Sequence, residues 1–299
     1  MLLHQIALVS QSNSVTLPEL NQASAALQKQ MARDLRPIWE IDATVDAFAK
    51  LEDIPLGYWA VVLMDKIPYP AQGIHLNRKN GDPFALVEVS SNWALTTSHE
   101  ILEMLVDPSG NRTVASNSVK PGQGRVSYLV EVCDPSEAAR FGYTVNGFLL
   151  SDFYTPEFYD PTPSSGVRYS FVGAIKRPRQ VLDGGYLSWF DPATEHAFQV
   201  FVTGNRKTFR DLGKVPGGFG KAGTLRSFTD NNEYAVGHRL KALAGTPVKG
   251  LVLSAAFGAG GVRAGKAFMA GQRAIGGELQ GNAKLIQAQI DDVVKGKGQ

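Results

Sequence analysis

The stretch at residues 98–108, in a helix expected from about Trp93 to Asp107, places the strongest constraint on this chain. In this stretch Ser98 is a favoured N-cap residue, and Pro108 is expected to stop the helix. On this helix His99, Glu103 and Asp107 lie four residues apart and share one stripe, while Glu100 lies about 100° further round. In His-Glu-x-x-His helices, two side chains one turn apart hold zinc and the glutamate polarises a water. Here the second position is Glu103, whose carboxylate suits zinc or a harder divalent ion.

Two more acidic residues interrupt an apolar segment further along the chain. The pattern of residues 128–135 predicts a buried strand, yet Glu131 and Asp134 fall within it. A buried charge costs several kcal/mol unless it is paired or bound to a metal. Two interpretations follow: an ion pair with an arginine such as Arg112 or Arg140, or a role as metal ligands beside the helix.

The third metal ligand is expected from this strand, not from the helix. Asp107 lies two turns from His99, about 12 Å along the axis, and metal–oxygen bonds of about 2 Å cannot close that gap. Asp107 is therefore expected to bond the following loop. In a regular strand Glu131 and Asp134 face opposite sides, so only one would reach the metal. Asp134 is favoured because it ends the strand before a proline, and Glu131 is the alternative.

The elements that precede the motif helix predict an α+β fold. Their order is a strand, a long helix capped by Thr16, two strands, a short edge strand at residues 73–76 and a further strand. Pro37 is expected to end the long helix, with the second strand at residues 38–43. This order resembles the N-terminal half of the zincin-like fold, above all the metzincin arrangement. That resemblance implies a mixed sheet whose edge strand borders the cleft and can pair with an extended peptide.

The motifs together are similar to a zincin-like metalloprotease family. It includes uncharacterised bacterial proteins and the plant phosphate-induced, Exordium-like proteins. In this chain the resemblance covers roughly residues 57–160, with Cys133 one place before the aspartate instead of two places after it. The motifs that carry it are His99-Glu100-x-x-Glu103, then Asp107-Pro108, then Glu131-x-x-Asp134.

The resemblance implies a zinc-dependent peptidase that acts on a peptide or protein substrate. Glu100 would be the general base that activates the attacking water and later protonates the leaving amine. Tyr154, or alternatively Tyr159, could donate a hydrogen bond to the oxyanion, although aromatic packing under a loop is the simpler role. The candidate ligands for zinc, or for another divalent ion, are His99, Glu103, Asp134 and Glu131.

The chain is expected to have three parts. Residues 1–165 form the zincin-like metal-site domain, and residues 166–245 form a β-rich extension. The extension has a hairpin at 185–202 and a basic, Gly-rich loop at 203–231. Residues 246–299 form a Gly/Ala-rich C-terminal helical segment.

The uneven charge of the chain motivates a second hypothesis. Residues 1–204 contain 15 basic and 22 acidic side chains, net −7, whereas residues 205–299 contain 15 and 6, net +9. The zincin-like body would then be a non-catalytic structural or cargo protein that docks into a larger assembly through its basic C-terminal third. Nucleic acid is the less favoured partner of this basic region.

Cysteine content and hydropathy bear on the compartment. Cys133 is the only cysteine, so no intrachain disulfide forms, which fits a reducing compartment. The N-terminus lacks a basic segment followed by a long apolar run, and no segment reaches the length of a membrane span. A cytoplasmic location is expected, with export by a signal-peptide-independent route as the alternative.

Overall fold

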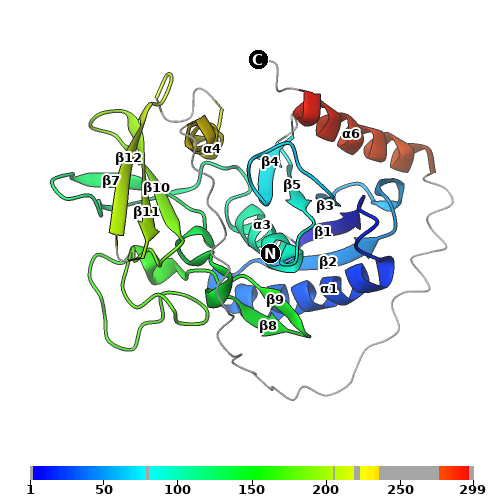
Figure 1. Cartoon of the computed structure of the whole chain (residues 1–299), viewed down its shortest axis with the longest axis horizontal. Helices are drawn as coiled ribbons and strands as arrows, with labels where there is room; N and C mark the ends of the chain where they lie inside the picture. The colour runs from blue at the N-terminus through cyan, green and yellow to red at the C-terminus, as the bar shows by residue number, and fades with distance from the viewer. Residues whose placement is uncertain (1–2, 79–80, 205, 219–222, 236–275, 296–299) are drawn as a thin grey trace.

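A five-stranded mixed sheet organises the N-terminal half of the chain (Figure 1). The computed structural model describes residues 3–78, 81–204, 206–218, 223–235 and 276–295. The strand order is β2-β1-β3-β5-β4, and only β4 runs antiparallel to its neighbour. The expected short edge strand is therefore present, at the end of the sheet. The strands are β1 (Leu3–Ser10), β2 (Asp42–Phe48), β3 (Trp59–Met64), β4 (Gly73–Asn77) and β5 (Pro83–Glu88).

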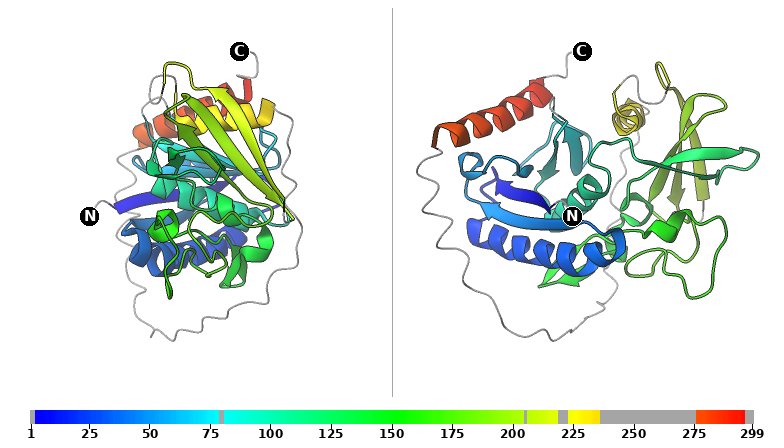
Figure 2. Two further views of the ribbon diagram at one scale, coloured as in Figure 1. Left: turned by 90° about the vertical axis from the view of Figure 1, so that its left-hand side faces the viewer. Right: turned by 180° about the vertical axis from the view of Figure 1, so that it is seen from behind.

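Helices cover both faces of this sheet (Figure 2). Side chains alternate along a strand, so Ile6 and Leu8 of β1 join the core beneath α1 (Leu17–Lys29) and α3 (Trp93–Val106). Ala7 and Val9 point to the opposite face, which α6 (Gly276–Lys295) covers. The strands are thus apolar on both sides, as expected for a sheet buried between two helical layers.

The first helix confirms its predicted start but not its predicted end. Thr16 Oγ1 accepts a hydrogen bond from the Glu19 N–H, which caps α1. The helical path continues through a π segment (Gln30–Leu35) into α2 (Arg36–Trp39), so the prediction that Pro37 ends the helix is wrong. Pro37 lies in the first turn of α2, where a missing N–H is tolerated. The second strand therefore begins at Asp42 instead of residue 38.

A second, antiparallel five-stranded sheet forms the other half, in the order β12-β11-β10-β7-β6. The predicted hairpin at 185–202 is confirmed by β10 and β11. The prediction of a long loop at residues 203–231 is wrong, because this segment contains strand β12 and the start of helix α4. These elements are β6 (Thr113–Asn117), β7 (Arg125–Leu129), β10 (Tyr186–Asp191), β11 (His196–Thr203), β12 (Arg206–Lys214) and α4 (Leu225–Ala235).

A continuous aromatic core joins the two sheets. Trp189 of β10 is fully buried, with Tyr128 and Phe198 rings 5.8 and 6.0 Å from its ring. One hydrophobic cluster runs from this tryptophan to α1 and α3. Short elements complete the connections: the hairpin of β8 (Tyr143–Val145) and β9 (Phe148–Leu150), and the single turns Leu51–Asp53, Asp134–Ser136, Ala139–Phe141 and Pro156–Tyr159.

The described part of the C-terminal segment packs within the molecule. In α6, Ala283, Ile286 and Ile290 are buried on the mixed sheet, and Gln11 Nε2 donates to Gln287 Oε1 at 2.9 Å. Residues 246–275 lie outside the described residues, so the docking of this segment into an assembly stays a prediction. The boundaries at 165 and 245 likewise stay predictions. None of the described helices combines the length and apolar character that a bilayer span requires.

Candidate metal centre

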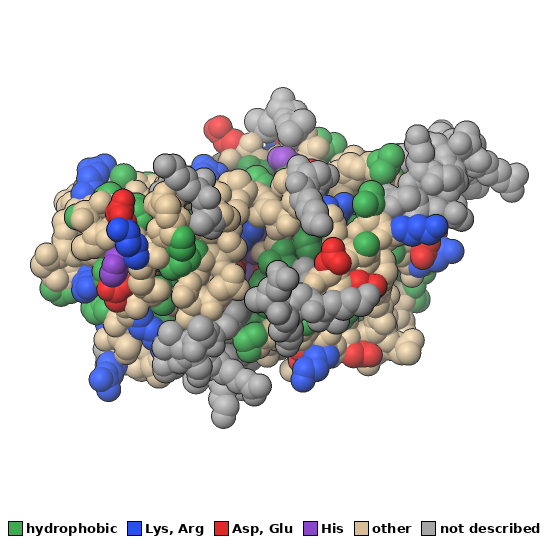
Figure 3. Space-filling model, turned by 90° about the horizontal axis from the view of Figure 1, so that it is seen from above, with side chains coloured by type: hydrophobic (Ala, Val, Ile, Leu, Met, Phe, Trp, Pro, Cys, Tyr) green, Lys and Arg blue, Asp and Glu red, His purple; other side chains and the backbone are tan. Residues whose placement is uncertain are grey.

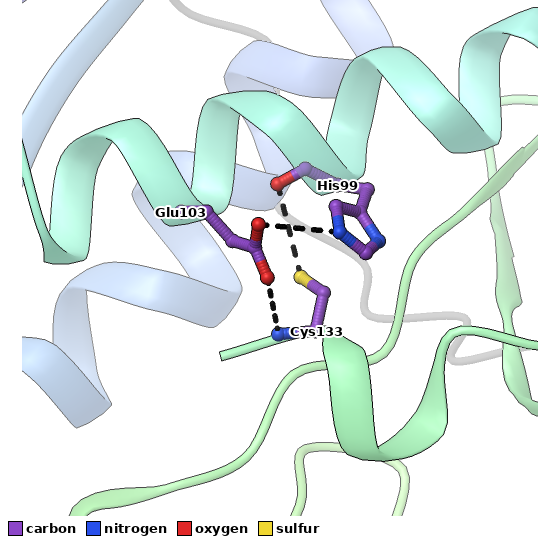
Figure 4. A group of neighbouring side chains, drawn as sticks. All are labelled: His99, Glu103 and Cys133. Atoms are coloured by element: carbon purple, nitrogen blue, oxygen red, sulfur yellow. Dashed lines mark hydrogen bonds and ion pairs between the residues drawn. The ribbon is translucent and has the colours of Figure 1, made fainter. Parts of the chain in front are cut away.

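Helix α3 presents two of the predicted ligands side by side (Figure 4). His99 Nε2 and Glu103 Oε2, one helical turn apart, are 3.2 Å from each other. Two ligands that each lie about 2.0–2.1 Å from a tetrahedral zinc are about 3.4 Å apart. The apolar residues of α3 pack into the core and fix this pair, since twelve of the fourteen helix residues are buried. The expectation that Ser98 caps this helix is wrong, because α3 begins at Trp93 and the Ser98 hydroxyl instead donates to Gln30 Oε1 at 2.8 Å.

The loop after β7 brings both downstream acids to this helix. The predicted strand at 128–135 is wrong in extent, because β7 ends at Leu129. Glu131 and Asp134 thus lie outside the strand, where side chains need not point to alternate faces. The expectation that only one of the two could face the site does not apply. Asp134 Oδ1 is 3.3 Å from His99 Nε2.

The proposed arginine partners of these two acids are engaged elsewhere. Arg140 forms an ion pair with Asp183 at 2.6 Å, and Arg112 Nη1 donates to the Val106 carbonyl at 2.8 Å. The ion-pair interpretation of Glu131 and Asp134 thus lacks the two cations it named.

The sequence analysis missed a second histidine in the site. His75 of edge strand β4 is only 3% exposed, and its Nδ1 is 3.0 Å from Glu100 Oε2. Its Nε2 is 3.8 Å from Glu131 Oε2. The only available signal was a lone histidine within an apolar edge strand close before the motif helix.

Cys133 is a further residue that the sequence analysis did not place in the site (Figure 4). Its N–H donates to Glu103 Oε1 at 3.1 Å, and its Sγ lies 3.8 Å from the His99 carbonyl oxygen. Burial raises the pKa of the Cys133 thiol well above its usual range, so it is protonated at neutral pH. Metal binding through its sulfur would require loss of that proton.

The donor atoms form three compact sets among the described residues. Within each set, one donor atom per residue lies within 4.8 Å of the others. Glu103 and His99 each belong to two of these sets, so they are the residues that the sets share. Glu103 and Asp134 occur in different sets, so a single ion held by both would draw their side chains together. The sets are His99, Glu103 and Cys133; His75, Glu103 and Glu131; and His99, Asp134 and Glu137.

Burial and the charges of neighbouring side chains together determine which of the candidate ligands carry protons. Burial alone would lower the pKa of His99, but the Glu103 carboxylate outweighs it and holds this pKa well above its usual range. Burial alone would raise the pKa of Glu103, but His99 lowers it to about 2. Burial, reinforced by Glu103, raises the pKa values of Glu131 and Asp134 well above their usual range. Without a cation the site thus contains one ion pair, between His99 and Glu103, and protonated neighbouring acids.

The general-base candidate is also perturbed. Burial raises the pKa of Glu100 to about 8. Burial, with the Arg226 charge in addition, lowers the pKa of His75 well below its usual range, so His75 is neutral. The hydrogen bond between His75 Nδ1 and Glu100 Oε2, at 3.0 Å, fixes the orientation of both side chains.

A cavity of about 160 Å³ opens between the two sheets above these residues. In Figure 3, histidine and Lys/Arg atoms are visible in the hollow between the two parts of the molecule. Arg226 of α4 lines the cavity and donates from Nη2 to Asn77 Oδ1 at 3.0 Å, although it is only 4% exposed. Its position within the predicted basic loop concealed it from the sequence analysis.

Two other predicted residues lie away from the cavity wall. Tyr154 is fully buried, and its hydroxyl is 2.7 Å from that of Tyr159, which in turn donates to the Leu129 carbonyl. Neither tyrosine lines the cavity.

Asp107 accepts hydrogen bonds from the N–H groups of Asn111 and Arg112, which confirms its expected role in the following loop.

Two buried polar atoms in the site have no hydrogen-bond partner: His75 Nε2 and Glu131 Oε1. An unsatisfied buried polar atom is costly, and a bound cation would satisfy both. The donor set, of imidazole nitrogens and carboxylate oxygens, suits zinc and other first-row divalent ions. No protein-family model, curated protein or solved structure matches this chain.

Proposed function

We propose that this protein is a metal-dependent hydrolase that cleaves peptide bonds with zinc or another divalent ion. The observation that carries the proposal is the position of His99 Nε2, 3.2 Å from Glu103 Oε2 and 3.3 Å from Asp134 Oδ1. His99 and Glu103 line the cavity. Both distances suit ligands of one tetrahedral ion. The strand order of the mixed sheet, with an antiparallel edge strand beside the motif helix, also supports it.

His99, Glu103 and Asp134 would hold the ion. When bound, it supplies a Lewis acid that polarises the scissile carbonyl and the attacking water. Glu100 takes the proton of that water on its carboxylate and passes it to the leaving amine nitrogen. His75 Nδ1 holds the Glu100 Oε2 atom at 3.0 Å, which orients this carboxylate. A nearby cation lowers the raised pKa of Glu100 towards neutrality, where a general base works best.

Edge strand β4 supports an extended peptide as the substrate. It pairs with β5 on one side and ends the described sheet on the other. Its residues Gly73, Ile74 and His75 line the cavity, so a peptide added to this edge would cross the ligand group. A Cβ at Gly73 would overlap Glu100 Oε1, so glycine is needed for the strand to approach the helix this closely.

Removal of the proposed base tests the mechanism. In Glu100→Gln we expect peptide hydrolysis to fall by about 10²–10⁴-fold, the usual contribution of a general base. The ion on His99, Glu103 and Asp134 should be retained, because Glu100 is not one of its proposed ligands. The matched control is Glu52→Gln, a change at an exposed carboxylate outside the cavity, which should keep full activity. Wild-type hydrolysis by a folded Glu100→Gln protein would contradict the role of Glu100.

Gly185 tests how the second sheet positions Asp134. A Cβ at Gly185 would lie 2.5 Å from the Asp134 carbonyl oxygen and 2.7 Å from that of Pro135, both backbone atoms that cannot rotate away. In Gly185→Ala we expect a loss of about 1–3 kcal/mol in unfolding free energy and weaker zinc binding by calorimetry. Gly124→Ala is the control, since its Cβ meets nothing within 4 Å. Equal zinc affinity in both variants would show that this backbone contact does not position Asp134.

A further inference from the structure

We propose that His75, Glu103 and Glu131 form a second divalent-cation site, so that Glu103 bridges two ions. This inference rests on the proposed function, which places the first ion on His99, Glu103 and Asp134. The second site joins edge strand β4, helix α3 and the loop after β7, three segments far apart in the sequence.

The geometry of the three side chains suits a cation. One donor atom of each lies within 4.8 Å of the other two, and His75 Nε2 is 3.8 Å from Glu131 Oε2. Ligands of a tetrahedral zinc lie about 3.4 Å apart, so small side-chain rotations suffice to close the site. His75, Glu103 and Glu131 are 3%, 3% and 7% exposed, so little water competes for these atoms.

Two buried atoms without hydrogen-bond partners lie where the second ion would bind. His75 Nε2 and Glu131 Oε1 are both buried without a hydrogen-bond partner. They belong to the two residues that the first ion does not use. A cation between them would remove the cost of two unsatisfied buried donors or acceptors.

Glu100 orients His75 as a carboxylate orients a metal-binding histidine. Histidine ligands commonly donate from the nitrogen that does not bind the metal to a carboxylate. His75 Nδ1 is 3.0 Å from Glu100 Oε2. When Glu100 is ionised, the proton of this contact lies on Nδ1 and the lone pair of His75 is on Nε2. That lone pair is the one closest to Glu131.

Glu103 is the residue that the two ions would share. Its Oε2 atom lies 3.2 Å from His99 Nε2, while Oε1 accepts the Cys133 N–H. A Glu103 oxygen also lies within 4.8 Å of donor atoms of His75 and Glu131, so Glu103 belongs to both ligand groups. Two-metal hydrolytic sites hold their ions about 3.5–4 Å apart, a separation that one shared carboxylate supports.

Zinc stoichiometry tests the proposal without relying on activity. Full-length wild-type protein and variants are equilibrated with zinc by dialysis, and bound zinc per chain is measured by elemental analysis. We expect two zinc ions in the wild type and one in His75→Ala. Glu131→Gln, which preserves the side-chain shape, should also hold one, so the test does not depend on how His75→Ala folds. His196→Ala is the matched control on the second sheet and should hold two.

The outcomes separate the two proposals. One zinc ion in the wild type, unchanged in His75→Ala and Glu131→Gln, would overturn the second site and leave the hydrolase proposal standing. No zinc in the wild type would overturn both. Two ions in the wild type that persist in both variants would show that the second ion lies elsewhere, which also overturns the inference.

Discussion

Glu103→Gln is expected to abolish high-affinity metal binding, the largest effect of any single substitution in this chain. Glu103 contributes to two of the three compact donor sets and carries the charge that pairs with His99. An amide keeps the shape of the side chain and can still accept the Cys133 N–H, but it removes the negative charge. We expect zinc affinity to fall by more than about 100-fold in calorimetric titrations.

The fold should survive this change, so the loss can be assigned to the site. Metal-free Glu103→Gln should still fold, because the core of α3 is unchanged and His99 can lose its proton, but loss of the buried ion pair should lower its melting temperature. Glu52→Gln provides a matched control at an exposed carboxylate. Wild-type zinc affinity in Glu103→Gln would mean that the ion binds elsewhere.

Zinc affinity is expected to rise steeply with pH, the second large effect. In the metal-free protein the pKa values of His99, Glu131 and Asp134 are held well above their usual ranges, so all three carry protons at neutral pH. A metal requires their lone pairs, so binding releases protons. Raising the pH removes this competition, and each released proton makes affinity rise about tenfold per pH unit.

The pH dependence of zinc affinity and the number of released protons can be measured separately. The ion held by His99, Glu103 and Asp134 displaces two protons, those of His99 and Asp134, so its affinity should rise about 100-fold per pH unit while these two groups remain protonated in the metal-free protein. Calorimetry in two buffers of different ionisation enthalpy counts the protons directly. An affinity that does not change between pH 6 and pH 7 would contradict the protonation states derived from the burial of this site.

Local patterns in the sequence were sufficient to predict several elements. The Thr16 cap, the apolar spacing of α3 and the turn between β10 and β11 each depend on neighbouring residues. They could therefore be predicted without knowledge of the rest of the fold. The same holds for His99 and Glu103, because one helical turn fixes their relative position.

Other features depend on contacts between distant segments. The end of β7 at Leu129 follows from pairing with β6 and β10, and the apolar residues beyond it gave no sign of that end. His75 enters the site only because β4 lies beside α3. Arg226 was hidden in a segment rich in glycine and basic residues, whose composition favoured a loop over β12 and α4.

Crystals of the zinc-loaded protein, with diffraction recorded at the zinc absorption edge, test the central claim most directly. An anomalous peak is expected in the cavity between β4 and α3, about 2 Å from both His99 Nε2 and a Glu103 carboxylate oxygen. Zinc peaks only at surface positions, with His99 and Glu103 still paired to each other and no peak between them, would contradict it.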